Sequence, residues 1–136
     1  MSGPFQDLDT AATGLAAAGF WLDTIAHNIA NVNTLAPGDR EPFRALSPVL
    51  AERIGAAGGP GEGVAVVGVV RAAGPPDLVY DPTHPLADAE GYVARPVVDV
   101  VGQMVDMMMA SRSYQANLQV LQAARERYEA SLRIGR

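Results

Sequence analysis

The chain contains no cysteine and only two histidines, which limits the chemistry it can perform. Without cysteine it can form neither a disulfide framework nor a thiolate metal site. It also lacks a cationic segment followed by an apolar run and a cleavage site, and the apolar stretch from Ala11 to Leu22 is shorter than a membrane span. We therefore expect neither a membrane anchor nor a cleavable signal peptide, so that any export would follow another route.

Charge is scarce as well. Charged residues make up 18% of the 136 residues against 49% for apolar ones, and the net charge is −5. All ten basic residues are arginine and none of them are adjacent, which leaves no basic footprint for nucleic acid. A chain of this length forms one folding unit, and so little charge covers the surface of a monomer poorly. The composition predicts that part of the surface meets other protein chains.

Proline is nearly absent from both ends of the chain. Nine of the ten prolines lie between Pro37 and Pro96, so that both flanks can form continuous helices. The N-terminal flank repeats apolar residues every seven positions over about residues 7–31, and the C-terminal flank carries a similar stripe. The predicted helix seam comprises Leu8, Leu15, Leu22, Ile25 and Ile29 on the first helix and Val100, Met104, Met107, Tyr114, Leu118 and Leu121 on the second.

We predict a mainly α fold with a β insertion. Two amphipathic helices at opposite ends of a short chain bury their stripes most simply against each other, so residues 1–33 and 98–136 are expected to pair antiparallel as a discontinuous, coiled-coil-like domain. Residues 34–97 form the small β-rich insertion. Strands are predicted at residues 64–70, 78–80 and 92–94, and a flexible glycine-rich loop at residues 55–63.

Both flanks carry apolar residues in more directions than one partner helix can cover. Residues 11–22 contain no charge, and Met107, Met108 and Met109 point to different sides of their helix. A pair of helices cannot bury all these side chains alone. The pattern favours assembly with neighbouring chains, and a poorly charged monomeric core is the alternative.

No motif in the chain predicts catalysis. His27 and His84 stand in different segments, and the chain has no Gly-x-Ser-x-Gly nucleophile turn. Asp77, Asp81, His84 and Asp88 could gather around a cation, but their spacing matches no calcium loop or zinc helix. The glycine-rich stretch lacks the Gly-Lys-Ser/Thr ending of a phosphate loop. We expect no enzyme, no metal, no cofactor and no small-molecule substrate, with a small ligand-binding module as the alternative.

Three segments of the chain resemble the flagellar rod and hook axial proteins. Residues 25–34, IAHNIANVNT, are similar to the Asn-x-Ala-Asn-x-x-Thr signature that ends the first helix in this family, and residues 110–118, ASRSYQANL, to its C-terminal counterpart. Residues 75–93 are similar to a segment that marks one proximal-rod member. The resemblance assigns these motif residues: Asn28, Ala30, Asn31, Thr34, His84, Pro85, Asp88, Gly91, Tyr92, Arg112, Tyr114, Ala116 and Asn117.

The resemblance implies a structural subunit of the proximal rod, the shaft that crosses the periplasm of a flagellated bacterium and transmits torque from motor to hook. Its implied partners are other copies of the chain, other proximal and distal rod proteins, the adaptor between rod and membrane ring, and the type III export apparatus. Another rod protein of the same architecture is the alternative. Trp21, Asp23, Val97 and Gly102 depart from the family pattern, so polar contacts between subunits are not carried over to these positions.

Overall fold

The computed structural model describes residues 4–54 and 61–134, which form two long helices and five strands. Helix α1 spans Pro4–Ala30 and helix α2 spans Val100–Ile134. The strands between them are β1 (Ala36–Pro37), β2 (Leu46–Glu52), β3 (Val64–Arg71), β4 (Asp77–Tyr80) and β5 (Tyr92–Arg95). The fold is mixed α and β, with small antiparallel sheets between the two helices in sequence, as predicted in outline.

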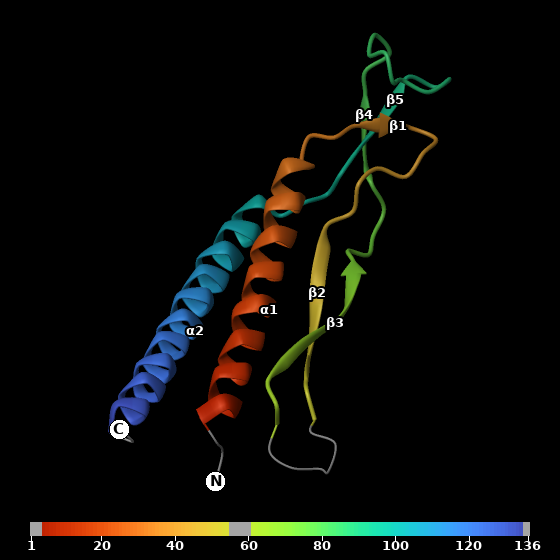
Figure 1. Ribbon diagram of the computed structural model, residues 1–136. Helices are drawn as coiled ribbons and strands as arrows, with labels where there is room; N and C mark the ends of the chain where they lie inside the picture. Colours follow the sequence, from red (N-terminus) through yellow and green to blue (C-terminus); the bar gives the residue numbers. More distant parts are fainter. Residues whose placement is uncertain (1–3, 55–60, 135–136) are drawn as a thin grey trace.

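The two helices lie side by side and run in opposite directions, which brings both ends of the chain to the same end of the molecule (Figure 1). Proline suits the first position of α1 because its fixed φ is already helical and its missing N–H would have no partner there. Asp99 caps the start of α2, where its Oδ1 accepts a hydrogen bond of 3.0 Å from the backbone N–H of Gly102. Over the described residues, neither helix combines the length and apolarity that a membrane span requires.

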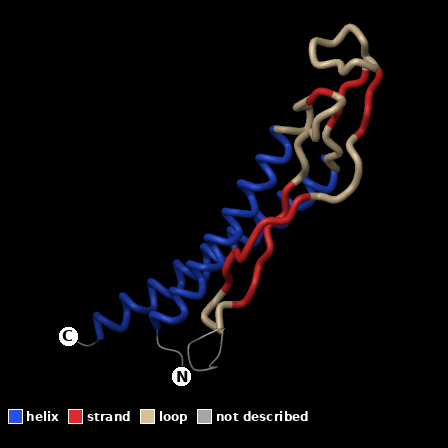
Figure 2. Tube along the Cα trace, turned by 90° about the vertical axis from the view of Figure 1, so that its right-hand side faces the viewer, coloured by secondary structure: helices blue, strands red, loops and turns tan. Residues whose placement is uncertain are grey.

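Two small sheets accompany the helices. Strands β2 and β3 form an antiparallel hairpin, and β1, β5 and β4 form a three-stranded antiparallel sheet in that order. The hairpin contacts α1 on the side away from α2, while the three-stranded sheet lies beyond the helices, at the end farthest from the chain termini (Figures 1 and 2). Residues 55–60 of the predicted glycine-rich loop lie outside the described residues.

Strand β2 is the main element that the sequence analysis missed. It contains Pro48, which argues against a strand because proline cannot donate to a ladder. The backbone N–H of Leu46, two residues earlier, bonds to a side chain of α1 rather than to β3. Since backbone groups alternate along a strand, the nitrogen of Pro48 also faces away from β3 and no ladder hydrogen bond is lost.

The core between the helices is made of small side chains. Its buried alanines are Ala11, Ala17 and Ala18 on α1 and Ala110 and Ala124 on α2. Ile25 and Asn28 are the largest fully buried side chains of the described residues. Small residues allow two helices to approach closely, and apart from Ile25 the larger apolar side chains described on the two helices are half-buried or exposed.

Candidate assembly surface

Asn28 joins three elements of the fold. Its side chain is fully buried near the C-terminal end of α1. The amide Nδ2 donates to the backbone oxygen of Leu46 at 2.8 Å and to Oε1 of Gln103 at 2.7 Å, and Oδ1 accepts from the backbone N–H of Leu46 at 2.8 Å. Asn28 therefore fastens β2 and α2 to α1 with every polar atom of its amide in use.

The end of α1 is closed by the residues that follow Asn28. Asn31 donates from Nδ2 to the backbone oxygen of His27 at 2.9 Å, and the Thr34 hydroxyl donates to Oδ1 of Asn31 at 3.2 Å. The His27 ring meets the Phe43 ring edge to face, with centroids 5.3 Å apart. These contacts stop the helix and direct the chain toward the sheets, so His27 and Asn31 have structural roles here.

Two glycines of α1 lie against side chains of α2. A Cβ placed on Gly14 would lie 2.8 Å from Oδ1 of Asn117, and one placed on Gly19 would lie 3.8 Å from the ring of Tyr114. Asn117 in turn donates from Nδ2 to the backbone oxygen of Ser113 at 3.0 Å. Two residues of the C-terminal motif thus pack directly against glycines of α1.

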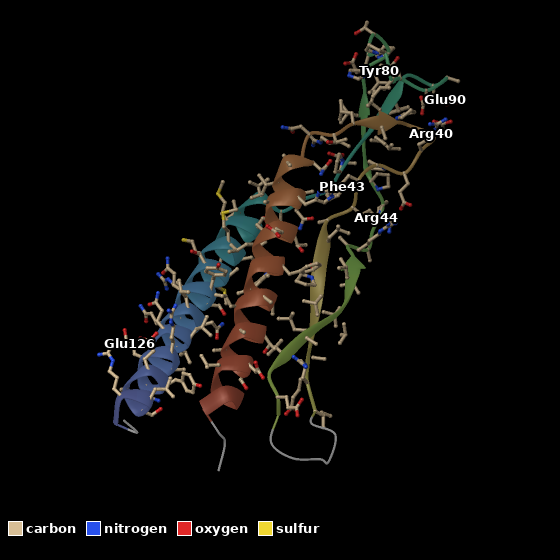
Figure 3. The ribbon with its side chains drawn as sticks, in the orientation of Figure 1. Arg40, Phe43, Arg44, Tyr80, Glu90 and Glu126 are labelled. Atoms are coloured by element: carbon tan, nitrogen blue, oxygen red, sulfur yellow. The ribbon has the colours of Figure 1, made fainter. Side chains whose placement is uncertain are left out.

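Helix α2 also carries an apolar stripe on the side away from α1. Four of its members share one side of the helix, and Val97 lies just before the first residue of the helix. All five are strongly exposed: Val97 at 62%, Val101 at 73%, Met104 at 55%, Val105 at 45% and Met108 at 57%. Farther along the same side the residues become polar, beginning with Arg112 and continuing through Gln119 to Glu126, which projects away from α1 in Figure 3. We call residues 97–108 on this side the outer stripe of α2.

The loop between β4 and β5 is held in shape by its own carboxylates. Oδ1 of Asp81 accepts from the backbone N–H of Thr83 at 3.2 Å and from the Thr83 hydroxyl at 2.8 Å. Oδ1 of Asp88 accepts from the backbone N–H groups of Glu90 at 3.1 Å and Tyr92 at 2.7 Å. This loop lies at the sheet end of the molecule, where Tyr80 projects in Figure 3.

Other groups of the same loop also form a hydrogen bond or close contacts. His84 accepts through Nδ1 from the backbone N–H of Leu86 at 3.1 Å. Gly91 has a φ of +86°, which favours glycine, and a Cβ on Gly38 would lie 2.1 Å from Oδ2 of Asp88. The loop therefore has a rigid, densely bonded turn where the sequence could have suggested a cation site.

The described residues have one resolved pKa shift and a few exposed ion pairs. The hydrogen bond from the Thr83 side chain lowers the pKa of Asp81 below its ordinary value of 3.8, against a small opposing effect of burial. Arg95 pairs with Asp77 between β5 and β4, and Arg125 pairs with Glu129 at 3.0 Å on exposed α2. Ion pairs this exposed contribute little to stability, and none of them forms a proton donor and acceptor aimed at a common cavity.

Comparison with known proteins identifies the family. Residues 8–35 match the family described as flagella basal body rod protein, and residues 89–134 match the family described as flagellar basal body rod FlgEFG protein C-terminal. The flagellar basal-body rod protein FlgC of Salmonella typhimurium is 44% identical over 93% of this chain and 94% of its own length. Those of Borreliella burgdorferi and Bacillus subtilis are 35% and 33% identical over 97% of this chain, and over 97% and 98% of their own lengths.

The chain belongs to the FlgC family of flagellar basal-body rod proteins. This confirms the predicted resemblance and makes the chain a structural subunit of the flagellar basal-body rod rather than an enzyme. The two matched segments cover α1 from Leu8 onward with its closing turn, and all of α2, which are the elements that the predicted signatures occupy.

The structure separates the predicted seam residues of this FlgC relative into two groups. Most are buried or half-buried: Leu8, Leu15, Leu22, Ile25, Ile29, Val100, Met107, Leu118 and Leu121. Met104 belongs to the outer stripe, and Tyr114 is 36% exposed beside Gly19. On α2, the positions facing α1 include the polar residues Gln103 and Asn117, which a hydrophobic pattern cannot select.

The residues of the family motifs fall in three places. Asn28, Asn31 and Thr34 form the junction and end of α1, with Ala30 exposed beside them. The central motif residues His84, Pro85, Asp88, Gly91 and Tyr92 lie in the loop between β4 and β5 or at its end, and Arg112, Ala116 and Asn117 lie on α2. Of the departures from the family pattern, Trp21 is half-buried, Asp23 is exposed, Val97 is in the outer stripe and Gly102 is at the cap of α2.

Hollows in the described part of this FlgC relative have no marked ligand chemistry. One of about 630 Å³ lies between α1 and the hairpin and is lined by polar or small residues, including Asp9, Thr13, Arg53 and Glu62. Ligand sites are usually apolar with a few convergent polar groups, which this lining does not provide. Within residues 4–54 and 61–134, no three His, Asp or Glu side chains are placed to hold a metal ion.

Proposed function

We propose that this FlgC-family chain polymerises with copies of itself and with other proximal and distal rod proteins into the part of the drive shaft that crosses the periplasm. In that position it would also meet the adaptor between rod and membrane ring, and it would reach the rod through the flagellar type III export apparatus without a cleavable signal peptide. Transmission of torque then requires stiff contacts between subunits and no reaction at the chain itself.

We propose one role for the helical part of the fold and another for the insertion. Residues 1–33 and 98–136 act as one coiled-coil-like helical unit, supported by the antiparallel helices, the buried alanines and the close approach of Gly14 to Asn117. Residues 34–97 act as the insertion that packs beside this unit, with residues 55–63 as a passive connector. The seam residues, from Leu8 to Ile29 and from Val100 to Leu121, would hold the helical unit together and contact its neighbours.

The observation that carries the proposal is the outer stripe of α2. Its five side chains, Val97, Val101, Met104, Val105 and Met108, are 45–73% exposed in the single chain and are interrupted by no charge on that side of the helix. Burying apolar surface contributes about 25 cal/mol per Å², so a stripe of this kind strongly favours a protein partner. Clustered methionines also adapt to neighbours that are similar but not identical.

The Asn28 junction gives the subunit the stiffness that such a role needs. It ties α1, α2 and β2 together by hydrogen bonds of 2.7–2.8 Å from the fully buried side chain of Asn28, so the insertion cannot turn freely about the helices. A force applied to the helical unit would therefore be transmitted to the insertion, because no flexible joint separates the two parts at this point. This supports a load-bearing subunit over a small ligand-binding module.

The test is to place a charge in the outer stripe. In a flagellated bacterium that lacks its own copy of this subunit, Met108→Asp should abolish swimming and remove the chain from isolated basal bodies, because an unpaired buried carboxylate costs several kcal/mol. Gln119→Asp, on the polar continuation of the same side, should leave both intact. Because Met108 is 57% exposed, the variant should keep its helical circular dichroism. Normal swimming of Met108→Asp would contradict the proposal.

A further inference from the structure

A second apolar surface lies across the molecule from the outer stripe. It is formed by the side of the β2–β3 hairpin that carries Leu50, which is 46% exposed, and Val69, which is 43% exposed. Val69 is paired with Pro48, and side-chain alternation along β2 puts Leu50 on the same side as Pro48. We call Leu50 and Val69 the hairpin patch. Strand β3 has β2 on only one side, so exposed β-branched residues here would invite uncontrolled association unless something covers them.

The hairpin patch and the outer stripe lie on opposite sides of α1. In Figure 1, α2, α1 and the hairpin follow one another across the molecule, and α1 contacts both of the others. Two different apolar surfaces on opposite sides of one chain cannot pack against each other within that chain. They can do so only between successive copies. Such a head-to-tail contact is heterologous and propagates into a ring or an open helix.

The two surfaces also lie at the same level along the molecule. At one end of the hairpin, Asn28 joins Gln103 of α2 to Leu46 of β2. At the other end, the Thr13 hydroxyl accepts from the backbone N–H of Val64 at 3.1 Å, and the next residue, Gly14, lies against Asn117. The hairpin therefore runs beside residues 103–117 of α2, about 21 Å at ~1.5 Å per residue, and β2 points in the same direction as α2.

Charge gives the contact its register. The hairpin patch ends at the exposed Glu52, which leaves β2 on the same side as Leu50, and the outer stripe ends at the exposed Arg112. Neither charge has an ion-pair partner among the described residues. At the end farther from the three-stranded sheet, each surface is thus bounded by one charge, negative on the hairpin and positive on α2. At the other end, the same side of the hairpin carries the exposed Arg71.

We propose that the hairpin patch of one copy covers the outer stripe of α2 in the next copy, with Glu52 beside Arg112. Leu50 lies two residues from Glu52, about 6.6 Å along β2, and Met108 lies four residues from Arg112, about 6 Å along α2. When Glu52 is beside Arg112, Leu50 is therefore beside Met108. Within one chain Glu52 lies level with Asn117, so the pairing shifts the neighbour by about five residues of α2, or ~7.5 Å, along the axis. That axial step favours a helical arrangement of copies over a flat ring.

This inference rests on the proposed rod function, and disulfide cross-linking tests it because the chain has no cysteine of its own. Basal bodies are isolated from cells whose only copy is Leu50→Cys/Met108→Cys, then oxidised and resolved without reductant. We expect covalent dimers and longer ladders of this chain. Each single variant should give none, and a mixture of the two single variants should give dimers only. Leu50→Cys/Gln119→Cys, which moves the second thiol eleven residues along α2, should give none.

Several outcomes would overturn the inference. One is the absence of cross-links although the basal bodies contain as much of the double variant as of the unchanged chain. The others are dimers formed by a single variant and cross-links to a different rod protein. A charge reversal provides a measurement without cysteine: Arg112→Glu should reduce the amount of chain in basal bodies, and adding Glu52→Arg should restore it. Failure of the restoration would also overturn the pairing. If the unchanged chain itself were missing from basal bodies, the proposed rod function would fail instead.

Discussion

Replacing Asn28 by alanine tests the junction on which the arrangement of the subunit depends. The substitution removes three hydrogen bonds at once, two to the backbone of Leu46 and one to Gln103. It leaves the backbone N–H and carbonyl of Leu46 and the Gln103 amide oxygen without their partners in a place where Asn28 is fully buried. No other side chain in the described residues links α1, α2 and β2 in this way.

The size of the effect follows from the bonds lost. A net contribution of about 0.5–1.5 kcal/mol for each hydrogen bond gives roughly 1.5–4.5 kcal/mol for three. Leu46 and Gln103 are half-buried, so water can reach part of the exposed backbone and reduce the loss. We expect a destabilisation of about 2–4 kcal/mol, a large share of the ~5–15 kcal/mol typical of a domain.

The assay is urea unfolding of the purified chain, followed by the fluorescence of Trp21, the only tryptophan, which lies half-buried in α1. The midpoint should fall by roughly 1–2 M while the slope stays the same. Asn33→Ala is the matched control, because Asn33 is exposed just beyond the same helix end. If Asn28→Ala unfolds within about 0.5 kcal/mol of that control, the junction does not stabilise the fold and the reasoning is refuted.

Three further predictions concern other parts of the chain. Gly14→Leu should force the helices apart at Asn117 and destabilise the fold by about 1–3 kcal/mol in the same urea assay. An NMR titration should give a pKa for Asp81 below 3.8, and Thr83→Ala should raise it toward that value. Because the folded pKa is lowered, the stabilisation is present above pH 3.8 and disappears as the pH falls through the lower, folded pKa. Replacing residues 56–61 by a Gly/Ser stretch of different length should leave swimming and basal-body assembly unchanged.

Each of these three predictions has a control or a result that would contradict it. Ala16→Leu adds the same side chain to an exposed position of α1, so an equal loss there would show that Gly14 has no special role. A Thr83→Ala variant whose Asp81 pKa did not move would mean that the hydroxyl is not its main cause. Complete loss of assembly after the loop replacement, with the chain still exported, would show that residues 56–61 make a specific contact.

Much of the fold could be predicted because its helices satisfy simple local rules. Flanks nearly free of proline, with apolar residues at helical spacing, became α1 and α2, and the β-branched run at residues 64–70 became β3. The predicted strands at 78–80 and 92–94 became β4 and β5, each one residue longer at one end. In each case the local preference and the burial pattern point to the same structure, which is why the sequence was sufficient.

The missed features depend on partners that are distant in sequence. Strand β2 exists because Asn28, eighteen residues before Leu46, supplies the hydrogen bonds of its free edge. Asn31, three residues later, lies at the end of the helix and donates to the backbone oxygen of His27. A capping asparagine and a buried bridging asparagine look alike in a sequence, and only the position of the chain that returns beside the helix distinguishes them.

The same limit explains how the predicted stripe of α2 relates to the structure. Hydrophobicity selects Val100, Met104 and Met107 as one seam, yet Val100 and Met107 are half-buried while Met104 is exposed on the outer stripe. The side facing α1 admits the polar Gln103 because Asn28 satisfies its amide oxygen. A helix that serves one partner inside the chain and another outside it carries two overlapping stripes, and periodicity alone cannot assign their members. Exposure in the folded chain can, because it shows which stripe is uncovered. Under the proposed function, the uncovered stripe meets the neighbour. That is the distribution expected of a subunit whose strongest apolar contact forms only when it joins its neighbours.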